Sequence, residues 1–140
     1  MSDEHPVQPL AAYIKIGTNG EPSLEGFRCA KCGEVLLETR RACPKCAAPD
    51  SLRPTPLADR GTVFSYTIVH RSFPGIQTPF ISAIVELEGG GFIKGNLLGV
   101  KCEANDAIFR TRVRIEFDRV PARADRPELL RHVFVPIEEQ

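Results

Sequence analysis

Cys29-Ala-Lys-Cys32-Gly33 and Cys43-Pro-Lys-Cys46-Ala47 are near-copies of one motif, and they decide the fold of the first part of this 140-residue chain. Each is a Cys-x-x-Cys pair, and the segment between the pairs, residues 34–42, fits a short β-hairpin arm. Four thiolates in two short loops can surround one Zn²⁺ as a tetrahedron in which sulfur is the only type of ligand. The spacing therefore predicts a zinc ribbon with four metal ligands: Cys29, Cys32, Cys43 and Cys46.

The same four residues would also suit a rubredoxin-like iron site or two redox dithiols. Two pairs in register, with no βαβ pattern around them, favour a bound metal over redox chemistry. A site closed by four sulfurs has no open coordination position, so its metal would fold the ribbon and would not activate water. We therefore expect the zinc to be structural.

The composition is that of an ordinary globular protein, with 42% hydrophobic and 26% charged residues. Eighteen basic and eighteen acidic residues cancel, which argues against a dedicated nucleic-acid-binding protein, because such proteins are usually basic. No apolar run approaches the roughly 20 residues that a membrane span needs, and the N-terminus lacks the features of a signal peptide. We expect no membrane association and a cytoplasmic location, where cysteine pairs hold metal more often than they form disulfides.

The pattern predicts three parts: an N-terminal arm (1–22), the zinc ribbon (23–53) and a β domain (57–140). The Pro-rich stretch 50–60 is interpreted as a linker. The fold class is thus mostly β, a rubredoxin-like zinc ribbon followed by a five-stranded OB-type barrel, although an SH3-like barrel or a small sandwich could give a similar pattern. Runs of β-branched and aromatic residues predict strands at 62–70, 80–88, 92–98, 111–120 and 132–137.

The β domain offers little catalytic chemistry. His70 and Arg71 end the first strand and could together hold a phosphate, or they could be an ordinary solvated pair. Cys102 has no catalytic signature around it and is interpreted as a small buried residue. Gly89–Gly91 is predicted to be a hairpin turn. Phe64, two positions before Tyr66, is expected to share its inward face. We predict no catalytic residues in this chain.

Three stretches carry a resemblance to a known family: Leu24-Glu-Gly-Phe-Arg-Cys29-Ala-Lys-Cys32-Gly33, Cys43-Pro-Lys-Cys46, and Arg60-Gly-Thr-Val-Phe-Ser-Tyr-Thr-Ile-Val-His70-Arg71. Together they resemble the zinc-ribbon/OB-fold proteins that associate with thiolase-fold enzymes of acyl-CoA metabolism. Residues 21–29 look most like the member that belongs to a benzoylsuccinyl-CoA thiolase. The chain differs from the family at Ala47, where glycine is usual, and in a longer insertion at 121–130.

The resemblance implies a hetero-oligomer in which a thiolase-fold partner supplies the catalytic groups. This chain would be a subunit with no activity of its own, which stabilises the partner and shapes or gates its CoA and acyl site. It implies that CoA or acyl-CoA is shared with the partner, and His70 and Arg71 are the candidate contacts. The alternative reading is a zinc-ribbon/OB protein that binds single-stranded nucleic acid through aromatic side chains on a basic groove.

Overall fold

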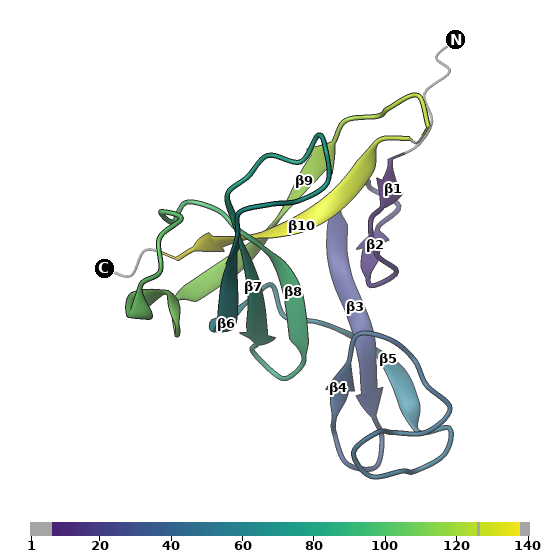
Figure 1. The fold of residues 1–140 in the computed structure, drawn as a ribbon. Coiled ribbons are helices and arrows are strands. Elements are labelled where there is room, and N and C mark those ends of the chain that lie inside the picture. The colour runs from purple at the N-terminus through teal and green to yellow at the C-terminus, as the bar shows by residue number, and fades with distance from the viewer. Residues whose placement is uncertain (1–6, 126, 138–140) are drawn as a thin grey trace.

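Five long strands close into a barrel in the second half of the chain (Figure 1). The computed structural model describes residues 7–125 and 127–137. The strands pair in the order β6-β7-β8-β10-β9, and β9 pairs back with β6 to close the ring. All pairs are antiparallel except β8 with β10. This connectivity confirms the predicted OB-type barrel. The strands are β6 (Arg60–Val69), β7 (Phe80–Leu87), β8 (Phe92–Leu97), β9 (Arg112–Val120) and β10 (Leu129–Pro136).

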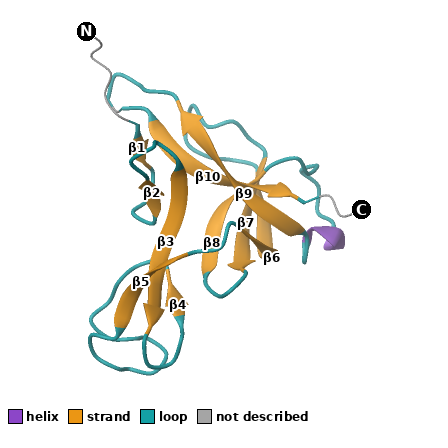
Figure 2. Ribbon diagram, turned by 180° about the vertical axis from the view of Figure 1, so that it is seen from behind, coloured by secondary structure: helices purple, strands orange, loops and turns teal. Residues whose placement is uncertain are grey.

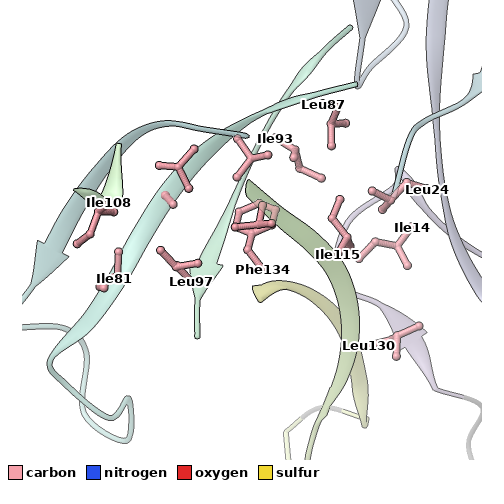
Figure 3. Packing of buried hydrophobic residues seen from close by; sticks show 14 residues of the cluster. Ile14, Leu24, Ile81, Leu87, Ile93, Leu97, Ile108, Ile115, Leu130 and Phe134 are labelled. Carbon is pink, nitrogen blue, oxygen red and sulfur yellow. The ribbon is translucent and has the colours of Figure 1, made fainter. Parts of the chain in front are cut away.

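The barrel interior follows from the alternation of side chains along each strand. In β9, Val113 and Ile115 point inward and are buried, whereas Arg114 between them is exposed. Phe134 of β10 is fully buried in the middle of this cluster (Figure 3). A strand with one buried face specifies its own register, because a one-residue slip would turn every apolar side chain outward.

Phe64 of β6 faces outward from the barrel, whereas the sequence predicted that it faces inward. The pairing of β6 with β7 shifts between Val63 and Ser65, so Phe64 is the extra residue of a β-bulge. Val63 is buried, Phe64 is 62% exposed, and Tyr66 packs against the core. The prediction that Phe64 and Tyr66 share an inward face is wrong, because a bulge breaks the two-residue period on which it rested.

The predicted N-terminal arm packs onto the barrel where the structure describes it; residues 1–6 lie outside the described part. β1 (Gln8–Pro9) adds to β10 in parallel, and β2 (Ile14–Ile16) pairs with β3 (Pro22–Cys29). Ile14 is 1% exposed and Leu24 is 5% exposed, and both belong to the barrel's hydrophobic cluster. In Figure 3 they lie beside Ile115, at the opposite end of the cluster from Ile108.

The ribbon is a small sheet built on the second half of β3, which runs from the barrel's edge into the metal-binding loops (Figure 2). β3 is the central strand: it pairs with β4 (Val35–Leu36) on one side and with β5 (Leu52–Pro56) on the other. The interpretation of 50–60 as a linker is therefore wrong for residues 52–56. Proline is tolerated on an edge strand, and β5 pairs with β3 alone, so Pro54 and Pro56 do not prevent pairing.

The ribbon contacts the barrel at the β7–β8 turn. Gly89, Gly90 and Gly91 all have positive φ, which confirms the predicted turn. A Cβ added at Gly90 would lie 3.0 Å from a methyl group of Val35 in β4, so the turn needs glycine both for its φ and for this close approach. Arg28 of β3 donates hydrogen bonds to the carbonyl oxygens of Gly33 (3.1 Å) and Gly89 (3.2 Å). These contacts join the first metal-binding loop to the barrel.

The described residues include one short 3-10 segment, η1 (Asp106–Ile108). It is capped by Asn105, whose side-chain oxygen accepts a hydrogen bond from the amide of Ala107. No helix of the described chain has the length and apolarity to cross a bilayer.

Candidate metal centre and ligand surfaces

The two cysteine pairs adopt the same loop. In the first, the Gly33 amide donates to the Cys29 carbonyl at 2.9 Å; in the second, the Ala47 amide donates to the Cys43 carbonyl at 2.8 Å. Both closing residues are left-handed, with φ of +83° at Gly33 and +64° at Ala47. The second loop therefore has the shape of the first although alanine replaces glycine, and Ala47 carries the backbone strain.

The four sulfur atoms lie together as the spacing predicted. Cys29 Sγ is 3.7 Å from Cys46 Sγ, and Cys32 Sγ is 3.6 Å from Cys43 Sγ. All four lie within 4.8 Å of one another. Four sulfurs at the Zn–S distance of about 2.3 Å in a tetrahedron would be about 3.8 Å apart, so the observed separations fit a single zinc ion.

The surroundings of the sulfurs favour a cation at their centre. A hydrogen bond with the Ser51 hydroxyl (3.2 Å), then one from the Cys32 amide (3.5 Å), lower the pKa of Cys29 to about 5. At Cys32 the Glu34 amide favours the thiolate, but desolvation and the neighbouring thiols together raise its pKa to about 12. The cluster therefore loses one proton easily and holds another tightly. Four thiolates at this spacing need a divalent ion to offset their repulsion.

The ribbon supplies a small apolar shell for the site. Cys29 and Cys43 are buried with Leu52, and Phe27 and Leu36 pack against them. Soft sulfur ligands in a closed set suit zinc or iron and exclude the hard, oxygen-preferring ions. This arrangement can hold a metal and fold a loop, but it leaves no position for a substrate.

His70 and Arg71 lie at the end of β6 and the start of the following loop, and both are exposed. Within the described chain, neither side chain has a hydrogen bond or an ion pair. Neither lines the cavity of about 860 Å³ whose residues from this loop begin at Gly75. Their role as CoA contacts stays a prediction.

His132, which the sequence gave no reason to single out, is buried in the core. Its Nε2 lies 2.7 Å from the Lys94 carbonyl oxygen, and its ring packs between Tyr13 and Phe134. Desolvation lowers the pKa of His132. The neutral ring donates through Nε2, since a carbonyl can only accept. A Cβ at Gly95 would come within 2.9 Å of Nε2, so this glycine makes room for the imidazole.

Cys102, the one cysteine outside the metal cluster, lies near the Pro79 carbonyl, with Sγ and O 3.7 Å apart. Among the described residues, no histidine hydrogen-bonds to it, and the His132 ring is committed to Lys94.

A four-cysteine ribbon joined to a closed five-stranded barrel defines the class of zinc-ribbon/OB-fold proteins. The family model for the rubredoxin-like zinc ribbon domain of ChsH2 matches residues 20–51, and the model for the ChsH2 C-terminal OB-fold domain matches residues 54–118. This chain belongs to that family, whose members also carry the name DUF35.

Relatives and a solved structure agree with this assignment. A DUF35 domain-containing scaffold protein of Methanocaldococcus jannaschii is 34% identical over 105 residues, which cover 73% of this chain and 72% of the relative. The benzoylsuccinyl-CoA thiolase subunit BbsA of Geobacter metallireducens is 28% identical over 106 residues, 73% of this chain and 71% of that protein. A chain of the Ltp2-ChsH2(DUF35) aldolase structure superposes with a TM-score of 0.61 at 26% identity, covering 81% of this chain and 84% of that one.

Proposed function

We propose that this chain is a non-catalytic subunit of a thiolase-type acyl-CoA enzyme complex. It stabilises a thiolase-fold partner and shapes or gates that partner's CoA and acyl site. Two similar proteins support this: one is named a thiolase subunit, and the other occurs in a structure named for two components, Ltp2 and ChsH2. The four-cysteine site has the geometry of a closed metal site that folds a ribbon, which suits a subunit with a structural role.

The observation that carries the proposal is an exposed apolar patch on the outer face of the barrel. Phe64, turned outward by the bulge, is 62% exposed and packs edge-on against Phe92, which is 49% exposed, with ring centroids 5.2 Å apart. Ile84 is exposed on β7, between these strands. We call Phe64, Ile84 and Phe92 the outer patch. Adjacent exposed aromatic and aliphatic side chains mark protein interfaces, where burying them away from water stabilises the complex.

In this proposal the ribbon stabilises the part of the barrel that carries the outer patch. Arg28 and Val35 tie it to the β7–β8 turn, which leads directly into the strands that carry the outer patch. A bound structural zinc would hold these contacts in place. His70 and Arg71 would meet CoA phosphates at the partner's entrance, because both are exposed and Arg71 can form bidentate contacts to phosphate.

The second candidate is a single-strand nucleic-acid-binding protein, which exposed aromatic side chains on an OB barrel would also serve. The outer patch favours it only in part, because Phe64 and Phe92 pack edge-on against each other and offer no open pair of ring faces. The net charge of zero supplies no general attraction for phosphates.

Affinity purification of the tagged chain from its own cell separates the two candidates. We expect a thiolase-fold protein to co-elute in near-equimolar amount. The variant Phe64→Ala should weaken that complex roughly 30-fold, the effect of losing an aromatic residue at the centre of an interface. Leu10→Ala, which removes an exposed apolar side chain from the far edge of the sheet, is the matched control and should leave it unchanged. Elution of the chain alone, with salt-dependent binding to single-stranded DNA, would replace the first candidate by the second.

A further inference from the structure

A cavity of the described chain lies at one end of the barrel, and none of its lining residues belongs to the zinc ribbon. Its volume is about 860 Å³. It lies between the β6–β7 loop, the ends of β7 and β8, and the residues that follow β8 and β9. In OB-folds, the loops between strands one and two and between strands four and five commonly bind ligands, and the corresponding loops meet here.

The cavity wall combines apolar and cationic groups. Ile76 and Leu98 line it and are 47% and 39% exposed, so a ligand could cover them. Arg123 lines it too, and its guanidinium closes over the β6–β7 loop: a Cβ added at Gly75 would lie 3.1 Å from Arg123 Nη2. No acidic residue is among the described residues that line the cavity.

Two guanidinium groups have unused hydrogen-bonding capacity at this wall. Arg123 has no ion pair within the described chain. Arg131 pairs with Asp118 through Nη2 at 3.0 Å, but its buried Nε has no hydrogen-bond partner in the part of the chain that the structure describes. An anion in the cavity could pair with the free guanidinium of Arg123 and share the guanidinium of Arg131 with Asp118.

We propose that this cavity binds a small molecule that carries an oxyanion, a carboxylate or a phosphate, on an apolar chain. The anion pairs with Arg123 and Arg131, because a guanidinium forms charge-assisted, often bidentate, hydrogen bonds with either group. The apolar chain lies on Ile76 and Leu98. All the residues of this site belong to this chain, so binding at the cavity needs no partner and does not depend on the proposed subunit role.

Three probes of equal chain length test the chemistry on the full-length, zinc-loaded protein: hexanoate, hexyl phosphate and hexanamide. We expect at least one anion to shift the backbone amide NMR signals of Gly75, Ile76 and Arg123. Neutral hexanamide should bind about tenfold more weakly, the effect of losing one charge-assisted hydrogen bond. Preference for hexanoate assigns the site to carboxylates, and preference for hexyl phosphate assigns it to phosphates; either supports the proposal.

Arg123→Gln is the diagnostic variant, since this exposed side chain can be changed without opening the core. It should weaken the preferred anion about tenfold and leave hexanamide unaffected. Arg41→Gln makes the same change of charge on the exposed ribbon and should not alter binding. Cys102 also lines the cavity, so the bound anion should slow alkylation of this thiol while the metal protects the other four.

Several results would overturn the proposal. Equal binding of hexanamide and the anions would show an apolar hollow without anion recognition. An equal loss in Arg41→Gln would indicate general electrostatic attraction. Amide shifts without protection of Cys102, or no shift up to the solubility limit of the probes, would place the ligand elsewhere or exclude it.

Discussion

The residue that closes each metal-binding loop is glycine in the first loop and alanine in the second, so exchanging the two residue types should have opposite effects on the two loops. Gly33 and Ala47 make the same hydrogen bond and share a left-handed backbone. A Cβ added at Gly33 would meet nothing within 4 Å, so Gly33→Ala changes backbone strain and little else. Ala47→Gly removes the same strain from the second loop.

The magnitude follows from the backbone. A left-handed conformation costs a residue with a Cβ about 1–2 kcal/mol. Glycine avoids this cost, but it makes the unfolded chain more flexible, which offsets about 0.4–1 kcal/mol of the stability gained. The net effect is about 1 kcal/mol per site, which is about fivefold in an equilibrium constant. Because the metal-binding loops need the metal to fold, this difference appears in the metal affinity.

Competition with a chromophoric zinc chelator measures that affinity. Ala47→Gly should bind zinc about fivefold more tightly than the parent and Gly33→Ala about fivefold more weakly. Gly20→Ala is the control: Gly20 is also left-handed (φ +84°) with open space around it, but it lies in the β2–β3 turn. It should lower overall stability by a similar amount and leave zinc affinity unchanged. Weaker zinc binding by Ala47→Gly would refute the reasoning.

Three further predictions concern the core and the metal site. Burial lowers the pKa of His132 from its usual 6.5, so as the pH falls the unfolded chain binds a proton before the folded chain does, and stability should be full above pH 6.5 and fall below it. Urea unfolding at about pH 7.5 and about pH 5.5 should therefore show a smaller loss of stability in His132→Gln than in the parent. Equal losses of stability in the two proteins would contradict this prediction. Gly95→Ala should destabilise the protein by about 1–3 kcal/mol in urea, because the new Cβ meets the His132 ring; an unchanged midpoint would show that the ring moves freely. Ser51→Ala should raise the pKa of Cys29 and weaken zinc binding roughly tenfold in the chelator competition, and unchanged affinity would deny Ser51 this role.

The ribbon and the barrel were predictable for different reasons. The metal ligands come in two local pairs whose spacing alone brings the sulfurs together, so no long-range information was needed. The barrel strands showed in composition and alternation, as in residues 111–120, where Val113 and Ile115 face the core. Both signals lie within a few residues of sequence.

The failures share one physical cause, because each depends on partners distant in sequence. Prolines suggested a linker at 50–60, but the edge of β3 accepts them in β5. The bulge that exposes Phe64 arises from the register with β7. The cavity joins Gly75 to Arg123, and no local pattern brings those loops together. His132 is buried because Gly95, on a neighbouring strand, leaves room for it.

The most direct test of the subunit role is reconstitution of the purified partner. The thiolase-fold protein recovered with this chain would be separated from it, and acyl-CoA turnover and thermal stability of each component measured alone and after recombination. We predict no turnover by this chain alone, and a partner that regains both turnover and stability when zinc-loaded chain is added back in equimolar amount. Turnover by the isolated chain, or a partner whose activity and stability do not respond to it, would contradict the account.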